Sequence, residues 1–184
     1  MFGYARISVG EISLITRGKV ISKDDIKEHA GDYPVYSSQT ENNGELGKID
    51  SYMFDGEYLT WTTDGANAGT VFYRTGKFNV TNVCGLIKVD NEIAISKYVF
   101  YALQIEAPRY VNSGMGNPKL MSNVMDRISI ILPTKEEQTR IVTMLDRFNS
   151  LCNDITEGLP AEIEARQKQY EYYRDRLLSF KETN

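Results

Sequence analysis

The last third of the chain, from Leu132 to Phe180, has the clearest pattern of apolar and polar positions. Thr134 and Glu137 have the spacing of a capping box, which predicts that a helix starts here. Gly158-Leu159-Pro160 suits the end of one helix and the start of another. Between these signals, apolar residues recur in steps of three and four, as on one helix face. They are Ile141, Leu145, Phe148, Cys152 and Ile155.

The second predicted helix carries the seven-residue repeat Ile163, Tyr170, Leu177. This spacing favours pairing with another helix, although an apolar stripe can equally pack on the core of its own domain. Tyrosine and arginine alternate along it, and both are over-represented at protein interfaces. We therefore expect a docking face. Its residues are Ile141, Leu145, Phe148, Ile155, Ile163, Arg166, Tyr170, Tyr173, Arg174 and Leu177.

Ahead of this region, short apolar stretches alternate with clusters of turn-forming residues, which is typical of strands joined by loops. Ser8 and Glu11 have capping-box spacing and predict a short helix through Ile15. Ser96 is expected to cap a longer helix that ends before Pro108. Helical turns are expected at 23–29 and 122–125, and extended segments at 33–36, 57–62, 69–74, 78–81, 83–89 and 128–132.

These patterns predict a mixed α/β (α+β) domain followed by a C-terminal two-helix arm of coiled-coil type. The domain is expected to span residues 1–133 and the arm residues 134–184. At 41% hydrophobic and 25% charged residues, the composition is that of a globular protein. No apolar run approaches the ~20 residues that span a bilayer. We therefore expect a cytoplasmic protein without a membrane partner.

The chain offers few residues for metal binding or catalysis. It has two cysteines, Cys84 and Cys152, far apart in the sequence, and one histidine, so we expect no metal site. Asp24, Asp25 and Asp64 are the carboxylates that a small hydrolase could use, but no pattern places them together. We therefore expect no catalytic residue. The net charge of −4 argues mildly against nucleic acid as a partner, unless basic residues cluster locally.

Several stretches are similar to the specificity subunits of type I restriction–modification systems. The similarity covers essentially the whole chain and is most specific near the C-terminus. The segments that carry it are 132–141, 166–178, 9–12, 65–69 and 114–120. Such subunits usually contain two target-recognition domains, each followed by a helical conserved region. This chain has one of each, and so it resembles a half-length form.

The resemblance implies a non-catalytic subunit that recognises double-stranded DNA and holds methyltransferase (M) and restriction (R) subunits. S-adenosylmethionine and ATP are expected on those partners, and this chain contains no Gly-rich nucleotide loop. Two copies would pair through their arms, which implies a homodimer that reads an interrupted palindromic site. A truncated regulatory subunit, which competes for methyltransferase without forming a functional site, is the alternative.

Three polar loops have the composition needed to read DNA, since Asn and Gln suit adenine whereas Arg and Lys suit guanine or phosphate. Each could equally be an ordinary solvated turn, because the same residues favour turns for backbone reasons. The DNA-binding residues that we expect are Arg17, Lys19, Ser37, Ser38, Gln39, Thr40, Asn42, Asn43, Thr62, Thr63, Asp64, Asn67, Asn117 and Lys119.

Overall fold

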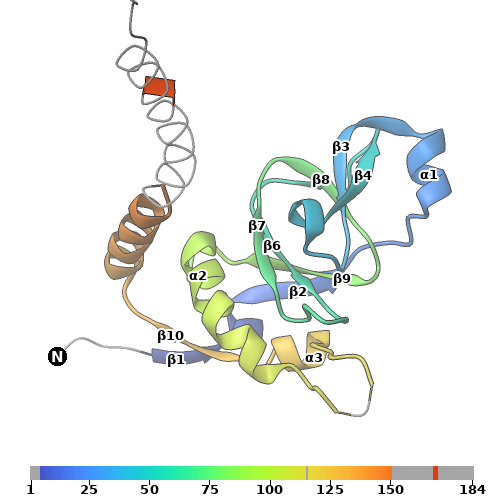
Figure 1. Ribbon diagram of the computed structural model, residues 1–184. Coiled ribbons are helices and arrows are strands. Elements are labelled where there is room, and N and C mark those ends of the chain that lie inside the picture. Colours follow the sequence, from blue (N-terminus) through green and yellow to red (C-terminus); the bar gives the residue numbers. More distant parts are fainter. Residues whose placement is uncertain (1–4, 115, 151–167, 170–184) are drawn as a thin grey trace, which may run out of the picture. The chain divides into compact units, whose positions relative to one another are not determined.

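The computed structural model describes residues 5–114, 116–150 and 168–169 of the 184-residue chain (Figure 1). The chain divides into two compact units, Met1–Val142 and Thr143–Asn184. The first unit therefore extends beyond residue 133, where the sequence predicts the end of the front domain. Within the described residues, no helix has the length and apolarity needed to cross a membrane.

The first unit contains a four-stranded antiparallel sheet in the order β2-β9-β6-β7. Its central strands are buried on both faces, which explains their nearly continuous apolar sequence. The strands are β2 (Ser13–Arg17), β6 (Tyr58–Thr62), β7 (Val71–Arg74) and β9 (Cys84–Val89).

A second sheet has the order β4-β3-β8-β5. Its only parallel pair joins β3 to β8 among the described strands, and this pairing sets Tyr36 opposite Val80. The strands are β3 (Ala30–Tyr36), β4 (Glu45–Ile49), β5 (Phe54–Asp55) and β8 (Lys77–Val80). The chain leaves β3 at Tyr36 directly into the first polar loop, so this register fixes where that loop begins.

Strand β1 (Ala5–Ser8) pairs antiparallel with β10 (Ser129–Leu132), with Ala5 opposite Leu132 (Figure 1). Helix α2 packs against strands of the first sheet and against β10. The helices are α1 (Lys23–Glu28), α2 (Ser96–Glu106) and α3 (Ser122–Met125), with 3-10 turns η1 (Val9–Glu11), η2 (Glu41–Gly44) and η3 (Ala107–Tyr110).

The larger apolar core is centred on Trp61, which is fully buried and donates from Nε1 to the Leu120 carbonyl at 2.9 Å. Gly85 lies against the indole, and a Cβ there would come within 2.3 Å of the ring. Burying a side chain of this size stabilises a domain by about 3–5 kcal/mol relative to alanine. The core therefore holds strand β6, and the segment around Leu120, in fixed positions at the edge of the sheet.

The mixed α/β class is confirmed, and each predicted extended segment contains a strand. Two local predictions are wrong. The Ser8–Glu11 capping box forms, but it opens only η1, and the chain then continues as β2 because its backbone pairs with β9. Ser96 does not cap α2. Ile95 occupies that position, and the Ser96 hydroxyl donates to Asn91 Oδ1.

Residues 135–150 are helical, which agrees with the predicted start of the arm. Gln138 fixes this start: it is 1% exposed, accepts from the Ile95 amide at 2.8 Å and donates to the Pro133 carbonyl. The predicted capping box is half formed. The Glu137 amide donates to Thr134 Oγ1, whereas its carboxylate accepts from Arg140, which lowers the pKa of Glu137. The first turns of this helix thus belong to the front unit.

Candidate nucleic-acid interface

Three polar loops meet at one edge of the first unit. They are called here the Ser37 loop (residues 37–44), the Asp64 loop (residues 63–68) and the Asn112 loop (residues 112–119). The Ser37 and Asp64 loops join at two points. The Thr63 amide donates to Ser38 Oγ at 2.8 Å, and Asn67 Nδ2 donates to Thr40 Oγ1 at 2.8 Å. These partners are 25 and 27 residues apart in the sequence.

The Asp64 loop is also joined to the Asn112 loop. The Gly65 amide donates to the Pro118 carbonyl at 3.0 Å, and the Leu120 amide donates to the Thr63 carbonyl at 2.8 Å. Asp64 and Lys119 form an antiparallel bridge. The middle loop therefore ties the other two into one continuous polar surface.

The Ser37 loop has an unusual backbone. Asn42, Asn43 and Gly44 are three consecutive residues with positive φ, at 48°, 53° and 78°. The loop is closed by the Ser37 amide donating to the Gly44 carbonyl at 3.0 Å and by Gln39 Nε2 donating to the Glu45 carbonyl at 2.7 Å. The side chains of Asn42 and Asn43 remain exposed.

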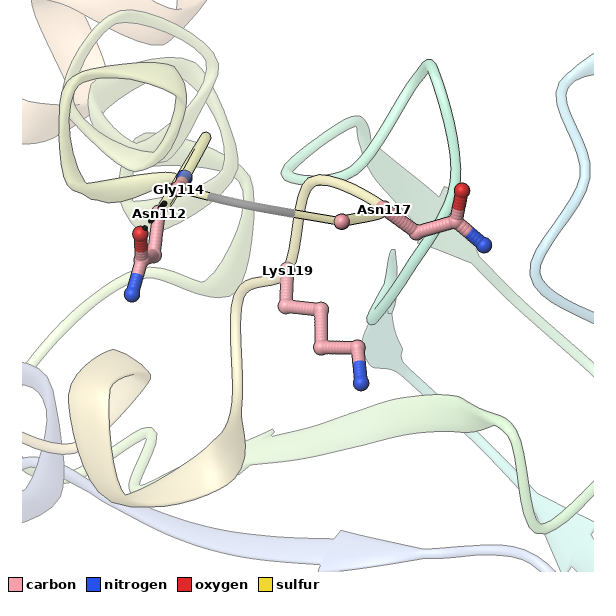
Figure 2. A pocket seen from close by; sticks show the side chains of 5 residues that line it. Asn112, Gly114, Asn117 and Lys119 are labelled. Carbon is pink, nitrogen blue, oxygen red and sulfur yellow. Dashed lines mark hydrogen bonds between the residues drawn. The ribbon is translucent and has the colours of Figure 1, made fainter.

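The Asn112 loop begins and ends at a bridge, in which Asn112 and Lys119 exchange backbone hydrogen bonds of 2.9 and 3.0 Å. Asn112 Oδ1 also accepts from the Gly114 amide at 2.9 Å. Figure 2 shows the side chains of Asn117 and Lys119 extending from the same segment, beside a recess of about 220 Å³. Amide donors and acceptors thus lie next to an exposed cation.

Arg17 and Lys19 flank this surface. Arg17 Nε donates to Ser122 Oγ at 3.2 Å, just beyond the Asn112 loop. The backbone of Lys19 bridges Thr81, whose hydroxyl donates to Ser37 Oγ at 3.1 Å. Both cations are exposed. The structure therefore places the expected phosphate-binding residues beside the expected base-reading loops.

The family model for the type I restriction modification DNA specificity domain matches residues 3–165. The chain belongs to this family. A match over so much of the chain confirms the resemblance seen in the sequence.

Curated relatives carry the same assignment. The chain is 46% identical over 177 residues to the type I restriction enzyme MpnII specificity subunit of Mycoplasma pneumoniae, covering 96% of the chain and 53% of that protein. A putative type I specificity subunit of the same organism is 45% identical, with 96% and 66% covered. The chain therefore spans about half to two thirds of the length of these two relatives.

Solved structures share the fold. The S subunit of a type I system from M. genitalium superposes with a TM-score of 0.68 at 18% identity, covering 98% of this chain and 47% of that one. The HsdS subunit from Thermoanaerobacter tengcongensis gives 0.63 at 16% identity, with 85% and 40% covered.

Two expected DNA contacts of this specificity domain are wrong. Thr62 and Thr63 are 1% and 3% exposed, and each hydroxyl is used inside the protein. Thr62 Oγ1 accepts from the Thr70 amide, and Thr63 Oγ1 donates to the Val83 carbonyl. They shape the Asp64 loop rather than face solvent. Ser38 is half-buried and similarly donates to the Val83 carbonyl.

The remaining predicted residues are accessible to different degrees. Ser37, Gln39, Thr40 and Asp64 are half-buried. The most exposed set is Arg17, Lys19, Asn42, Asn43, Asn67, Asn117 and Lys119. These seven are the residues best placed to reach DNA.

Sequence reasoning missed Arg74, the last residue of β7. This arginine is 3% exposed and donates to the Ser37 loop through the Asn43 carbonyl at 2.7 Å. Its signal in the sequence is weak: a cation two residues after Phe72, and hence on the same face of the strand.

The predicted docking face is only partly described. Ile141 is half-buried, whereas Leu145 and Phe148 are 38% and 64% exposed. The other predicted members, Ile155, Ile163, Arg166, Tyr170, Tyr173, Arg174 and Leu177, lie outside the described residues.

Two chemical properties limit what the described part of the chain can do. No group of three His, Cys, Asp or Glu side chains there could hold a metal ion. Cys84 is 2% exposed, and burial raises the pKa of its thiol from 9.0 to about 12. A neutral, enclosed thiol is a poor nucleophile.

Proposed function

We propose that the chain is a non-catalytic DNA-recognition subunit of a type I restriction–modification complex. The observation that carries the proposal is the joining of three polar loops, far apart in sequence, into one surface by direct hydrogen bonds. Ordinary solvated turns have no need to bond to one another. Membership of the specificity-domain family supports the same role.

In this role, the exposed amides of Asn42, Asn43, Asn67 and Asn117 read base edges in the major groove. Asn pairs with adenine through two hydrogen bonds, and each such pair discriminates against a wrong base by about 1–3 kcal/mol. Arg17, Lys19 and Lys119 contact phosphates, which fix the register without reading sequence. Because the net charge is −4, we expect the partner subunits to supply much of the positive potential.

The proposed partners are methyltransferase and restriction subunits, with S-adenosylmethionine and ATP bound to them. A cytoplasmic location follows from this role. The exposed apolar stripe at Leu145 and Phe148 supports a helix-docking function for the arm. A second copy of the chain is the occupant that we propose. Two reading surfaces related by a twofold axis would then recognise an interrupted palindrome.

Methylation measured on genomic DNA from a host that lacks the system tests the proposal. The full chain, its cognate methyltransferase and S-adenosylmethionine are incubated with this DNA, and modified adenines are mapped. We expect methylation at one interrupted, symmetric motif. Methylation at an asymmetric motif would contradict the homodimer, and no sequence-specific methylation would contradict the recognition role and leave the competitor role.

A further inference from the structure

The conformation at Asn42, Asn43 and Gly44 is rare for a chain of L-residues. All three backbones are left-handed, with ψ values of 42° at Asn42 and 30° at Asn43. The left-handed region brings Cβ close to the following carbonyl, so residues other than glycine enter it singly rather than in runs. Something outside the loop must therefore hold this turn, and such outliers concentrate at functional sites.

Arg74 is the buried side chain that contacts the turn. Its Nη2 donates to the Asn43 carbonyl at 2.7 Å, and its Nε donates to Thr60 Oγ1 at 3.1 Å. The guanidinium carbon lies 3.6 Å from the centroid of the Tyr36 ring and 4.4 Å from that of Phe72. The planar cation is thus fixed in position by two rings and two acceptors.

The turn also leaves no space around this cation. A Cβ added at Gly44 would come within 2.9 Å of Arg74 Nη2 and 3.1 Å of the Gln39 carbonyl. Gly44 therefore lets the backbone approach the guanidinium closely enough for the Asn43 carbonyl to accept its hydrogen bond. The left-handed turn and the buried cation fit each other.

Stability alone is a poor explanation for an arginine here. The two acceptors are a hydroxyl and a backbone carbonyl rather than a carboxylate, and burial lowers the pKa of the guanidinium. Enclosing a cation is costly, and a well-packed apolar side chain of similar volume often stabilises a protein more. What an apolar residue cannot supply is a directional donor to the Asn43 carbonyl.

We propose that Arg74 is a positioning residue that sets the specificity of DNA reading by holding Asn42 and Asn43 in their left-handed conformation. It does not touch DNA. It fixes the backbone from which the two amides project, so that they meet base edges without first losing conformational freedom. Because this role rests on the proposed function, its test must separate failure of Arg74 from failure of DNA recognition.

Arg74→Lys and Arg74→Met are the variants to compare. Arg74→Lys keeps the charge and most of the stem but replaces the planar fork by a single ammonium, which cannot reproduce both hydrogen bonds. Arg74→Met keeps only the unbranched stem. Folding of both is checked by circular dichroism and thermal melting, and Arg74→Lys decides the result if Arg74→Met does not fold.

Thr60→Val is the matched control. It leaves Arg74 Nε without its hydroxyl acceptor, and so it should destabilise the same buried cluster, but it preserves the bond from Nη2 to the Asn43 carbonyl. Lys77→Met is a second control. It removes another cation, one that lies 4.5 Å from the centroid of the Tyr52 ring and has no bond to the Ser37 loop.

The probe is the duplex that the wild-type chain, with its methyltransferase, enriches from a randomised library, together with its single-base-pair variants. The quantity measured is the ratio of the Kd for each variant duplex to that for the enriched duplex. For wild type, mismatches should raise Kd by about 5- to 150-fold. For Arg74→Lys and Arg74→Met, the ratio should fall below about threefold at the base pairs read by the Ser37 loop only, and stay unchanged elsewhere.

Thr60→Val and Lys77→Met should keep the wild-type ratios. Equal ratios for the folded Arg74 variants and wild type would overturn the positioning role while leaving DNA recognition intact. Loss of discrimination in Thr60→Val to the same extent would also overturn it, because general destabilisation would then explain the result. If wild type enriches no duplex, the proposed function itself fails.

Discussion

The Ser37 and Asn112 loops look alike in composition but are held in different ways. The Ser37 loop lies on a buried cation, is closed by a glutamine side chain and includes three consecutive left-handed residues. The Asn112 loop is joined at its two ends by the Asn112–Lys119 bridge and is bonded to its neighbour through Pro118. Only the first has support from the protein interior among the contacts of the described residues.

This difference predicts different contributions to binding. Side chains on a preorganised backbone lose little freedom when they meet DNA, so their hydrogen bonds contribute to discrimination. A loop fixed mainly at its ends must be ordered on contact, and its cation acts at longer range through the phosphates. We therefore expect the Ser37 loop to determine specificity and the Asn112 loop to contribute mostly affinity.

Replacing both Asn42 and Asn43 by glycine should have the largest effect. Asn42→Gly with Asn43→Gly keeps a backbone that favours positive φ and removes both amides. Discrimination against single mismatches should fall by about 1–3 kcal/mol at each base pair contacted. Binding of the enriched duplex and its mismatched variants, measured by fluorescence anisotropy, gives this value. Asn117→Gly is the matched change in the Asn112 loop, and an equal loss there would contradict the comparison.

Alanine at the same positions tests the strain. Asn42→Ala and Asn43→Ala should each lower the free energy of unfolding by about 1–2 kcal/mol, because a Cβ without a polar group is disfavoured in the left-handed region. Asn117→Ala should change it by less than about 0.5 kcal/mol, as expected for a surface position without such a constraint. Urea unfolding measures all three. A stable Asn43→Ala variant would show that the turn is not strained.

Lys119→Gln should weaken binding to every duplex by a similar factor. One lost phosphate contact lowers the slope of log K against log salt by about 0.9 and leaves discrimination unchanged. Titrations at several salt concentrations, with enriched and scrambled duplexes, measure both quantities. A change confined to one base pair would instead assign Lys119 to base reading.

The smallest expected effect concerns the buried cluster that contains Cys84 and packs against Tyr36, the last residue before the Ser37 loop. The folded-state pKa of Cys84 is about 12, above its ordinary value of 9.0, so the unfolded chain loses this proton first as pH rises. Stability is therefore unaffected below pH 9 and falls above it, at up to 1.4 kcal/mol per pH unit for one proton.

Comparison with Cys84→Ala isolates this contribution. Wild type should lose more stability than the variant between pH 8 and pH 10, by about 1 kcal/mol. Parallel pH dependences in urea unfolding would show that the thiol ionises as readily in the folded protein as in the unfolded chain.

Much of the fold was visible in the sequence because strands and helices follow local patterns. The strands around Trp61 and the turn signals that flank them were predicted from β-branched and aromatic residues. The Ser8 capping box was also recognised, but its outcome was not, since pairing of β2 with β9 involves residues more than seventy positions away. Local preference and tertiary pairing disagreed there, and pairing prevailed.

The candidate site was predictable in composition but not in geometry. Asn42, Asn67 and Asn117 were selected as polar loop residues, and the structure leaves all three exposed. Burial of Thr62 and Thr63 could not be seen, because it depends on the Val83 carbonyl and on closure of the Asp64 loop. Arg74 could not be assigned to the loop either, since its acceptor lies 31 residues earlier in the chain.

The central claim is that the three joined loops contact one stretch of DNA together. A photo-crosslinking amino acid, introduced singly at position 42, 67 or 117 of the full chain bound to its methyltransferase, tests this most directly. We expect each of the three to crosslink within the same half-site of the enriched duplex, and the same amino acid at position 77 not to crosslink. Crosslinks from position 77 with none from the three loops would contradict the account.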